Sequence, residues 1–433
     1  MHNLSKETNL FGKIDSMLSV DFIRSNLDFV KTATKNKNRS VDFDKILSLD
    51  EEVRGLQQKL QTLQAERNKL AKEKFSEENR LKGLKLKESI NEIESKLAPL
   101  QKLLEEILQE VPNPAFSDVP VGKNDEENVE VKKWGEMPKF DFEPLDHLTL
   151  GERLGILDFE RGAKVAGAQT YYLLGMGAML EIALINYALQ KLSSAGFLPV
   201  ITPDFAKSRY YLGTGYAPVG EEAQTYKIEG EDLGLVATSE VTLAGRHADE
   251  ILTEKELPIC YAGYSHCFRQ EAGAYGKYSK GLYRVHQFSK VEMFVYCLPE
   301  ESEKWHQKIL AIEEEILQEL GIPYRVLEMC TGDLGAMAAR KYDLEAWMPG
   351  RKGFGEVTST SNCTDFQARN LNIRYKKNDG EKGYIHMLNG TAVALSRTPI
   401  AILENFQQKD GSVVIPSVLR PFMGGLTEIK IRG

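Results

Sequence analysis

Cysteine is scarce and scattered in this chain of 433 residues. The five cysteines are odd in number, and no two of them form a C-x-x-C pair. A disulfide framework or a zinc finger is therefore not expected. Free thiols of this kind fit a reducing compartment, so we expect a cytoplasmic protein.

Long apolar runs are also missing. No run reaches the length that a membrane-spanning helix needs, so we expect no membrane segment. Residues 1–16 lack the apolar core of a signal peptide and mix acidic with basic residues. We expect them to be a short extension, or to follow from an upstream start codon.

Glycine-rich nucleotide loops and an excess of positive charge are absent as well. The chain contains no Walker loop and no G-x-G-x-x-G, which disfavours ATP binding of those two kinds. The net charge of -8 gives no overall attraction to nucleic acid, so any such site must be local. Hydrophobic content of 42% and the length are typical of a globular protein with two or three domains.

What the chain does have, in its N-terminal third, is a strong heptad pattern. Apolar residues alternate steps of four and three along two segments, with Arg67 at the one polar position of the first: Leu49, Val53, Leu56, Leu60, Leu63 and Leu70, then Leu86, Ile90, Ile93, Leu97, Leu100, Leu104, Ile107 and Val111. This pattern predicts two long helices that form an antiparallel hairpin over residues 48–111, with a connection at 74–84. Pro99 inside the second helix is predicted to kink it.

The charge of this predicted arm is uneven. Residues 54–87 carry ten Lys or Arg and four Glu, a net of +6, whereas residues 88–110 carry a net of -4. An oligomerisation strut is the commoner use of heptads and is the alternative interpretation. A basic, protruding end favours RNA that is bound through its shape and its phosphates.

A second stretch, residues 258–298, reads as a long β-hairpin. Two aromatic and β-branched runs flank a loop of Gly, Tyr, Lys and Ser. At the end of the first run, Arg269 and Glu271 are two apart and would project from one strand face. An arginine fork suits a phosphate, and a carboxylate can accept from an amine. An ion pair at a sheet edge is the alternative interpretation.

Three further stretches favour the phosphate-binding interpretation of Arg269 and Glu271 over the ion pair. They are Ala-Thr-Ser-Glu at 237–240, Glu-Val-Thr-Ser at 356–359, and the run from Asn389 to Thr398 that leads into a helical pattern. Together and in this order they resemble the class II aminoacyl-tRNA synthetases, and in detail the seryl-tRNA synthetases of the bacterial type. The hairpin matches the second signature motif of that class, and Gly390–Arg397 matches the third. The resemblance runs from about Met17 to the C-terminus.

The first signature motif of the class is a helix and a strand that end in proline. Residues 172–203 fit this description, and in the family the motif builds a homodimer interface. Short strands with few helices argue for a mainly antiparallel sheet flanked by helices. We therefore predict an α+β chain with a tRNA-binding helical arm at 17–118, a linker at 119–133 and a class II catalytic domain at 134–433.

The resemblance also implies an ATP site. Its residues would be Arg269, Gln270, Glu271, Val285, Phe288, Glu356, Val357, Thr358, Ser359 and Arg397. Arg269 would hold the α-phosphate and the substrate carboxylate, and Arg397 would hold the γ-phosphate at the start of the last helix. Mg²⁺ would be bound through Glu356 and Ser359, although a spacing of three does not share a face on a regular strand.

The serine site implied by the resemblance consists of Thr238, Ser239, Glu240, Glu292 and Thr391. We expect Thr238 and Glu240 to lie on one face of a strand and to receive the substrate ammonium. A buried carboxylate that accepts a hydrogen bond from the serine hydroxyl weakens the binding of alanine, because the carboxylate lone pairs would then stay unpaired. For each acidic residue taken alone, the alternative interpretation is an ion pair at a strand edge that has no role in substrate binding.

The activity implied is ATP-dependent activation of L-serine and its transfer to the 3′ end of tRNA(Ser), by a homodimer. Whether selenocysteine tRNA is a further partner stays open. Two alternatives stay open: another small-amino-acid ligase of this class, or a coiled-coil interaction protein on a dead synthetase scaffold. The second alternative predicts the loss of Arg269, Glu271, Glu356 or Arg397, and all four are present.

Overall fold

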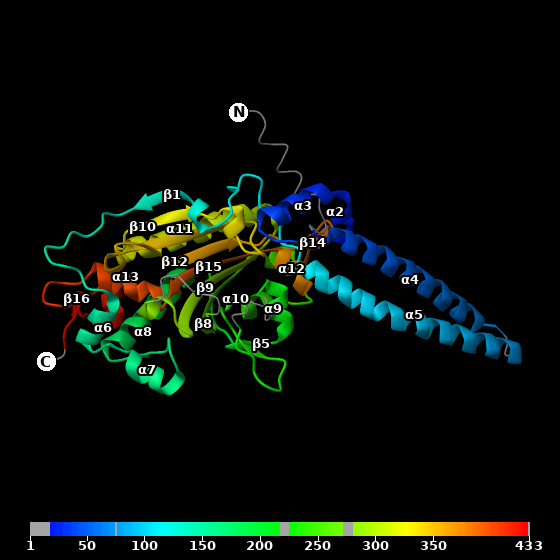
Figure 1. Cartoon of the computed structure of the whole chain (residues 1–433), viewed down its shortest axis with the longest axis horizontal. Coiled ribbons are helices and arrows are strands. Elements are labelled where there is room, and N and C mark those ends of the chain that lie inside the picture. The colour runs from blue at the N-terminus through cyan, green and yellow to red at the C-terminus, as the bar shows by residue number, and fades with distance from the viewer. Residues whose placement is uncertain (1–17, 74–75, 217–224, 272–279, 432–433) are drawn as a thin grey trace, which may run out of the picture. The chain divides into compact units, whose positions relative to one another are not determined.

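The computed structural model describes residues 18–73, 76–216, 225–271 and 280–431 (Figure 1). By its internal contacts the chain divides into two compact parts. We call Met17–Pro114 the N-terminal unit and Ala115–Gly433 the C-terminal unit. Each is described by itself.

The N-terminal unit is helical. Two short helices, α2 (Val20–Ser25) and α3 (Leu27–Asn36), precede the long helices α4 (Phe43–Leu70) and α5 (Glu77–Gln109). The two long helices pack along each other, as Figure 1 shows in blue and cyan. The predicted helical hairpin is therefore confirmed, and at 1.5 Å per residue α4 extends about 42 Å.

The ends of these helices differ from the prediction. Ser76 accepts a hydrogen bond from the backbone N–H of Asn79 at 3.1 Å, and this cap starts α5 at Glu77. The predicted connection at 74–84 is therefore wrong, because Gly83 lies inside the helix. Asp42 likewise caps α4, which begins at Phe43, five residues before the predicted start at residue 48.

The C-terminal unit is built on an eight-stranded sheet. Its order is β1 (Val129–Trp134), β10 (Tyr324–Glu328), β11 (Arg340–Met348), β12 (Gly353–Asn362), β15 (His386–Ala394), β9 (Gln287–Cys297), β8 (Ile259–Phe268) and β4 (Leu198–Ile201). All neighbouring pairs are antiparallel except β4 and β8. The predicted mainly antiparallel sheet is confirmed.

The central hairpin is formed by β8 and β9. Their register runs without a break from the pair Ile259 and Tyr296 to the pair Phe268 and Gln287. The tip of the hairpin, residues 272–279, lies outside the described residues. The predicted β-hairpin is confirmed over the arms.

The longer helices α8 (Met176–Ser194), α11 (Ser302–Leu320) and α13 (Arg397–Asn405) pack against this sheet. Smaller elements complete the unit: α6 (His147–Leu154), α7 (Phe159–Ala166), α9 (Ser208–Thr214), α10 (Glu240–Gly245), α12 (Phe366–Leu371), β2 (Leu157–Asp158), β3 (Tyr172–Leu173), β5 (Phe205–Ala206), β6 (Gly234–Leu235), β7 (Ile251–Thr253), β13 (Arg374–Lys376), β14 (Lys382–Tyr384), β16 (Val413–Val414) and β17 (Glu428–Ile429). Among the described residues, no helix has both the length and the apolar composition to cross a membrane.

One part of the predicted linker is a strand. Residues 129–133, which the prediction places between the domains, form most of β1 and pair with β10 at the edge of the sheet. Val119 is also buried, in a small apolar cluster with Leu327 and Met329. Residues 129–133 are therefore an exposed edge strand of the C-terminal unit rather than a free connection.

The two faces of the sheet have different neighbours. A side chain at Gly390 would run into Ile309 of α11, so this position on β15 faces that helix. Its neighbours Asn389 and Thr391 line a cavity. Because successive residues of a strand point to opposite faces, α11 covers one face and the cavity opens on the other.

Candidate active site

A cavity of about 480 Å³ lies against the central strands of the C-terminal unit. Most of the predicted site residues line it: Glu240, Arg269, Glu271, Val285, Phe288, Glu292, Glu356, Val357, Thr358, Ser359, Thr391 and Arg397. They come from six separate stretches of the chain. Thr238, Ser239 and Gln270 are not among the lining residues.

A β-bulge decides how Glu356 and Ser359 are arranged. Along β12, Ser359 is opposite Asp343 and Glu356 is opposite Glu345, and the register shifts by one residue at Val357. Asp343 and Glu345 are two apart on β11, so their partners share a face. The extra residue of the bulge therefore brings two side chains three positions apart onto the same side.

At this end of the cavity the charges are paired. Arg397 is the first residue of α13, and its Nη1 lies 3.1 Å from Glu356 Oε2. Burial acts to raise the pKa of Glu356, but the charges of Arg397 and Lys341 outweigh it and hold the pKa at about 2. A carboxylate that stays ionised beside a fixed arginine suits a metal ion and phosphates together.

The guanidinium of Arg397 is also held by Tyr283. Its central carbon lies 4.7 Å from the centroid of the Tyr283 ring, and its Nε donates to the Tyr283 carbonyl at 3.4 Å. Both residues line the cavity. The planar group is thus fixed by a stacked ring and by hydrogen bonds before any ligand arrives.

Arg269 and Glu271 lie at the next part of the wall, but not on a strand. The strand β8 ends at Phe268, and Glu271 has a φ of +52°, so the prediction that they share a strand face is wrong. Arg269 instead lies over the Phe288 ring, 5.2 Å from its centroid, and donates from Nε to the Ala237 carbonyl at 3.4 Å. Glu271 pairs with Arg284 at 2.6 Å.

The far end of the cavity holds a tight polar group. Thr391 is opposite Glu292 in the β15–β9 register and donates to its Oε2 at 3.0 Å. Lys290 lies 2.5 Å from the same carboxylate. All three side chains are buried. The arrangement leaves a charged, hydrogen-bonding surface suited to a small polar ligand.

Glu240 is the second carboxylate at this end. Its Oε1 accepts from Gln367 at 2.7 Å and from Asn389 at 2.8 Å, and its Oε2 accepts from the Tyr216 hydroxyl at 3.0 Å. Burial, followed by the nearby charge of Glu292, raises the pKa of Glu240 to about 7. A cation beside this carboxylate would favour its ionised form.

The segment before Glu240 corrects a prediction. The strand β6 is only Gly234–Leu235, and Glu240 begins α10, so Thr238 and Glu240 do not share a strand face. Thr238 is buried, and its Oγ1 accepts from the backbone N–H of Glu240 at 3.2 Å. The Ser239 hydroxyl points to the Gly263 carbonyl of β8, 3.5 Å away. Both hydroxyls support the turn that delivers Glu240.

The sequence of the chain matches known families over both units. The family model for the seryl-tRNA synthetase N-terminal domain matches residues 17–115, and the one for the tRNA synthetase class II core domain (G, H, P, S and T) matches residues 225–406. A serine–tRNA ligase of Treponema denticola is 53% identical over 417 residues, which cover 94% of this chain and 99% of the relative. The chain belongs to the serine–tRNA ligase family.

Solved structures of this family have the same fold. The seryl-tRNA synthetase of Pyrococcus horikoshii complexed with ATP has a TM-score of 0.87 and 43% identity, and the match covers 96% of this chain and 100% of that one. The cytoplasmic serine–tRNA ligase of Naegleria fowleri in complex with AMP has a TM-score of 0.83 and 35% identity, covering 97% and 100%. The predicted class II resemblance is therefore confirmed.

Several polar residues of this serine–tRNA ligase cavity were not predicted. Lys290 and Asn389 are each two residues from a predicted site residue on the same strand, so the period of two could have identified them. Lys341 and Tyr216 come from β11 and from the chain after α9. No local pattern marks these two, because only the packing of distant segments brings them to the site.

Proposed function

We propose that the cavity binds ATP at its Arg269 and Arg397 side and L-serine at its Glu240 and Glu292 side. As a member of the serine–tRNA ligase family, the chain activates serine with ATP and charges tRNA(Ser). The observation that carries the assignment of residues is the single cavity that gathers twelve of the predicted residues from distant segments.

For ATP, we assign the two arginines to the phosphates. In adenylation the serine carboxylate attacks the α-phosphate and pyrophosphate leaves. The protein's main task is to hold two anions in line and to neutralise the growing charge. We assign Arg269, which lies over the Phe288 ring, to the α-phosphate and the carboxylate, and Arg397, which pairs with Glu356, to the γ-phosphate. The Phe288 ring is proposed to stack on adenine, with Glu271 at its edge.

We assign Mg²⁺ to Glu356 and Ser359. The bulge places a carboxylate and a hydroxyl on one face, and the pKa of about 2 keeps Glu356 ionised. Within the described ranges, no group of three or more His, Cys, Asp or Glu side chains could hold a metal by itself. Mg²⁺ usually takes one or two carboxylates and completes its shell with phosphates and water, so this sparse set fits it. When bound, the metal would neutralise phosphate charge.

For serine, Glu240 is proposed to receive the ammonium, while Glu292 and Thr391 face the hydroxyl. Lys290 and Asn389 hold these groups in place. A threonine substrate would need room for one more methyl group within this buried set. Thr238 and Ser239 act through the turn rather than by contact.

The test of the function is pyrophosphate exchange with each of the twenty amino acids. We expect exchange that requires serine and Mg²⁺ and runs without tRNA, because the cavity contains both substrate subsites. Equal exchange with threonine or proline would contradict the assignment. It would favour another ligase of the class. No exchange with any amino acid would favour a dead scaffold.

The pKa of Glu240 leads to a pH prediction. At a pKa of about 7, Glu240 is mostly protonated below that pH and mostly ionised above it. An ammonium binds the ionised form, so the KM for serine should fall about tenfold between about pH 6 and about pH 8. The measurement is the serine KM in pyrophosphate exchange. Glu240→Gln should bind serine weakly with no such pH dependence. A flat wild-type profile would contradict the role of Glu240.

The helical arm is proposed to bind the tRNA. The prediction assigns residues 17–118 to this arm, 119–133 to a linker and 134–433 to catalysis. We keep the roles of the arm and of the catalytic domain as a proposal, whereas residues 129–133 belong to the sheet of the C-terminal unit. Lys72, Lys82, Lys85 and Lys87 near the turn of the arm are all exposed. Their charges suit the phosphates of an RNA helix. Selenocysteine tRNA is proposed as a second partner.

We also propose a homodimer in the cytoplasm. On α8 and β4, the first-motif elements, Met179, Ile182, Leu198 and Ile201 are exposed by 42%, 48%, 57% and 82%. Apolar exposure of this extent along one helix and an edge strand favours a protein interface. Five free thiols fit a reducing compartment.

A further inference from the structure

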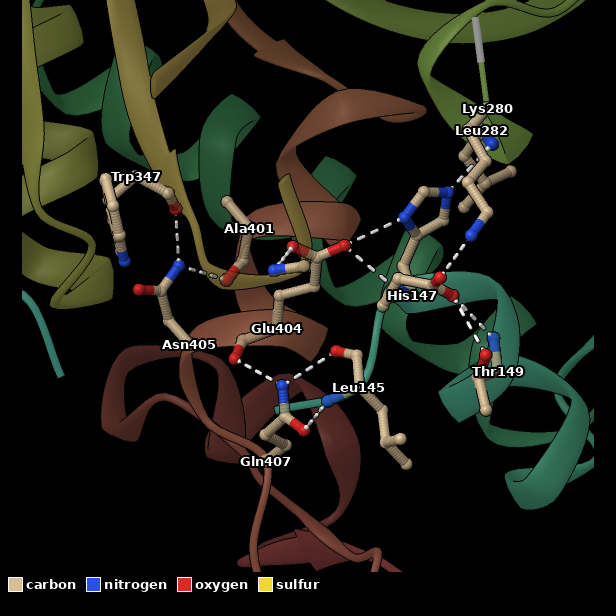
Figure 2. Close-up of polar contacts among 12 residues, drawn as sticks. Leu145, His147, Thr149, Lys280, Leu282, Trp347, Ala401, Glu404, Asn405 and Gln407 are labelled. Atoms are coloured by element: carbon tan, nitrogen blue, oxygen red, sulfur yellow. Dashed lines mark hydrogen bonds and ion pairs between the residues drawn. The ribbon is translucent and has the colours of Figure 1, made fainter. Parts of the chain in front are cut away.

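A polar cluster joins α6, α13 and the segment 280–286 that leads into β9, here called the return segment (Figure 2). His147 and Glu404 lie at its centre and are exposed by 0% and 1%. Glu404 Oε1 accepts from the backbone N–H of His147 at 3.0 Å and lies 3.0 Å from its Nδ1. Glu404 Oε2 accepts from Gly350 N–H at 2.9 Å. The buried carboxylate is thus surrounded by N–H groups.

The direction of one hydrogen bond determines the tautomer of His147. The backbone N–H of Leu282 can only donate, and it points to His147 Nε2 at 3.2 Å. Nε2 must therefore accept, so Nδ1 carries the proton and donates to Glu404. The imidazole is a bridge from a carboxylate of α13 to the backbone of the return segment.

This close approach depends on a glycine. Gly281 has a φ of +59°, and a Cβ at this position would lie 2.4 Å from His147 Nε2. A side chain here would therefore push the return segment away from the imidazole. Lys280 adds an ion pair to Asp146, the residue that caps α6.

The bridge lies one residue from the ATP side of the cavity. Leu282 is followed by Tyr283, whose carbonyl and ring hold Arg397. Arg397 and Glu404 are seven residues apart on α13, about two helical turns, and so lie on the same side of it. The helix α13 thus contacts two successive residues of the return segment. Arg397 binds Tyr283 directly, and Glu404 binds Leu282 through the His147 imidazole.

We propose that His147 is a positioning residue for ATP, which holds Tyr283 and Arg397 in the arrangement that receives the phosphates. This inference rests on the proposed ATP role of Arg397. Serine binds at the other end of the cavity, near Glu240 and Glu292, so its affinity serves as an internal reference. Loss of the Leu282 hydrogen bond should weaken ATP and spare serine.

Gln407 offers a matched control, because it joins the chain just after α13 to the chain just before α6 without touching the return segment. Its side chain accepts from the backbone N–H of Leu145 at 2.8 Å and donates to the Leu145 carbonyl at 2.9 Å (Figure 2). Gln407→Ala removes two hydrogen bonds between the chain after α13 and the chain before α6. A purely structural contribution of this region would appear equally in this variant.

Two substitutions of His147 separate its two hydrogen bonds. Asparagine can replace Nδ1 but does not reach Leu282, whereas glutamine can replace Nε2 and accept from Leu282. In pyrophosphate exchange by the full chain, His147→Asn should raise the KM for ATP about tenfold and change the KM for serine less than about twofold. His147→Gln should restore the KM for ATP to within about threefold of the wild-type value. Gln407→Ala should lower the melting temperature and leave both KM values unchanged.

The outcomes distinguish this inference from the proposed function. A wild-type chain without serine-dependent exchange would overturn the function. Normal wild-type exchange with an unchanged ATP KM in His147→Asn would overturn the role of His147 alone, as would equal effects on ATP and serine or an equal effect of Gln407→Ala. Should His147→Asn not fold, Gly281→Ala tests the same contact from the other side. It should raise the KM for ATP alone, and an unchanged KM would overturn the inference.

Discussion

Replacing Arg397 by alanine should lower the rate of serine-dependent pyrophosphate exchange by about 10²-fold or more. The substitution removes a proposed phosphate contact from a site where the guanidinium is already oriented by Tyr283 and Glu356. It also removes the charge that does most to lower the pKa of Glu356. The Mg²⁺ concentration needed for half-maximal exchange should therefore rise as well. Arg269→Ala should cause a loss of the same size.

Arg351 is the matched control for this loss. Its guanidinium lies over the same Tyr283 ring, 5.5 Å from the centroid, but Arg351 is not among the residues that line the cavity. Arg351→Ala should keep exchange within about threefold of the wild-type rate. An Arg397 or Arg269 variant that folds normally and exchanges at the wild-type rate would refute the role given to that arginine.

Shortening the helical arm should abolish most tRNA charging and leave serine activation largely intact. Leu70 of α4 lies 3.8 Å from the position of a Cβ at Gly83, which sets the pairing of the two helices. By this pairing Leu63 is level with Ile90, so residues 64–89 can be removed and the helices joined by a short turn. The loss should appear as a raised KM for tRNA, because the arm contributes binding rather than chemistry.

Aminoacylation and pyrophosphate exchange are measured on the same shortened protein. If both activities fall together, the arm is structural, and if neither falls, it does not bind the tRNA. Charge reversal of Lys72, Lys74, Lys82 and Lys85 in the full chain should reproduce part of the effect and reduce the salt dependence of tRNA binding. Lys74 lies outside the described residues. Reversal of Lys96 and Lys102, exposed lysines in the acidic half of α5, is the matched control.

The long elements of this fold could be predicted from the sequence, since each has a repeating pattern. The heptads predicted α4 and α5, and aromatic and β-branched runs predicted β8 and β9. Such patterns report which face of an element is buried. They do not report where it ends. The start of α5 at Glu77 depends on the Ser76 cap, and the strand at 129–134 is exposed along its whole length, so no buried face marks it in the sequence.

The composition of the candidate site was also predictable, but its geometry was not. The motifs identified the arginines and carboxylates through a family resemblance. Local alternation then misplaced Thr238, Glu240, Arg269 and Glu271 on strands, where the chain in fact turns. The spacing of Glu356 and Ser359 made sense only with the bulge at Val357.

By itself, the sequence determined that a helical N-terminal part precedes a second part, that the sheet of the second part is mainly antiparallel, and which charged residues belong to the candidate site. Each of these follows from local periodicity and from the chemistry of single side chains. Only the tertiary structure decided that Glu240 has a pKa of about 7, that Lys290 holds Glu292, and that His147 joins α13 to Leu282. The physical reason is the same in each case: these properties depend on burial and on partners distant in the chain, which exist only once the segments have packed together.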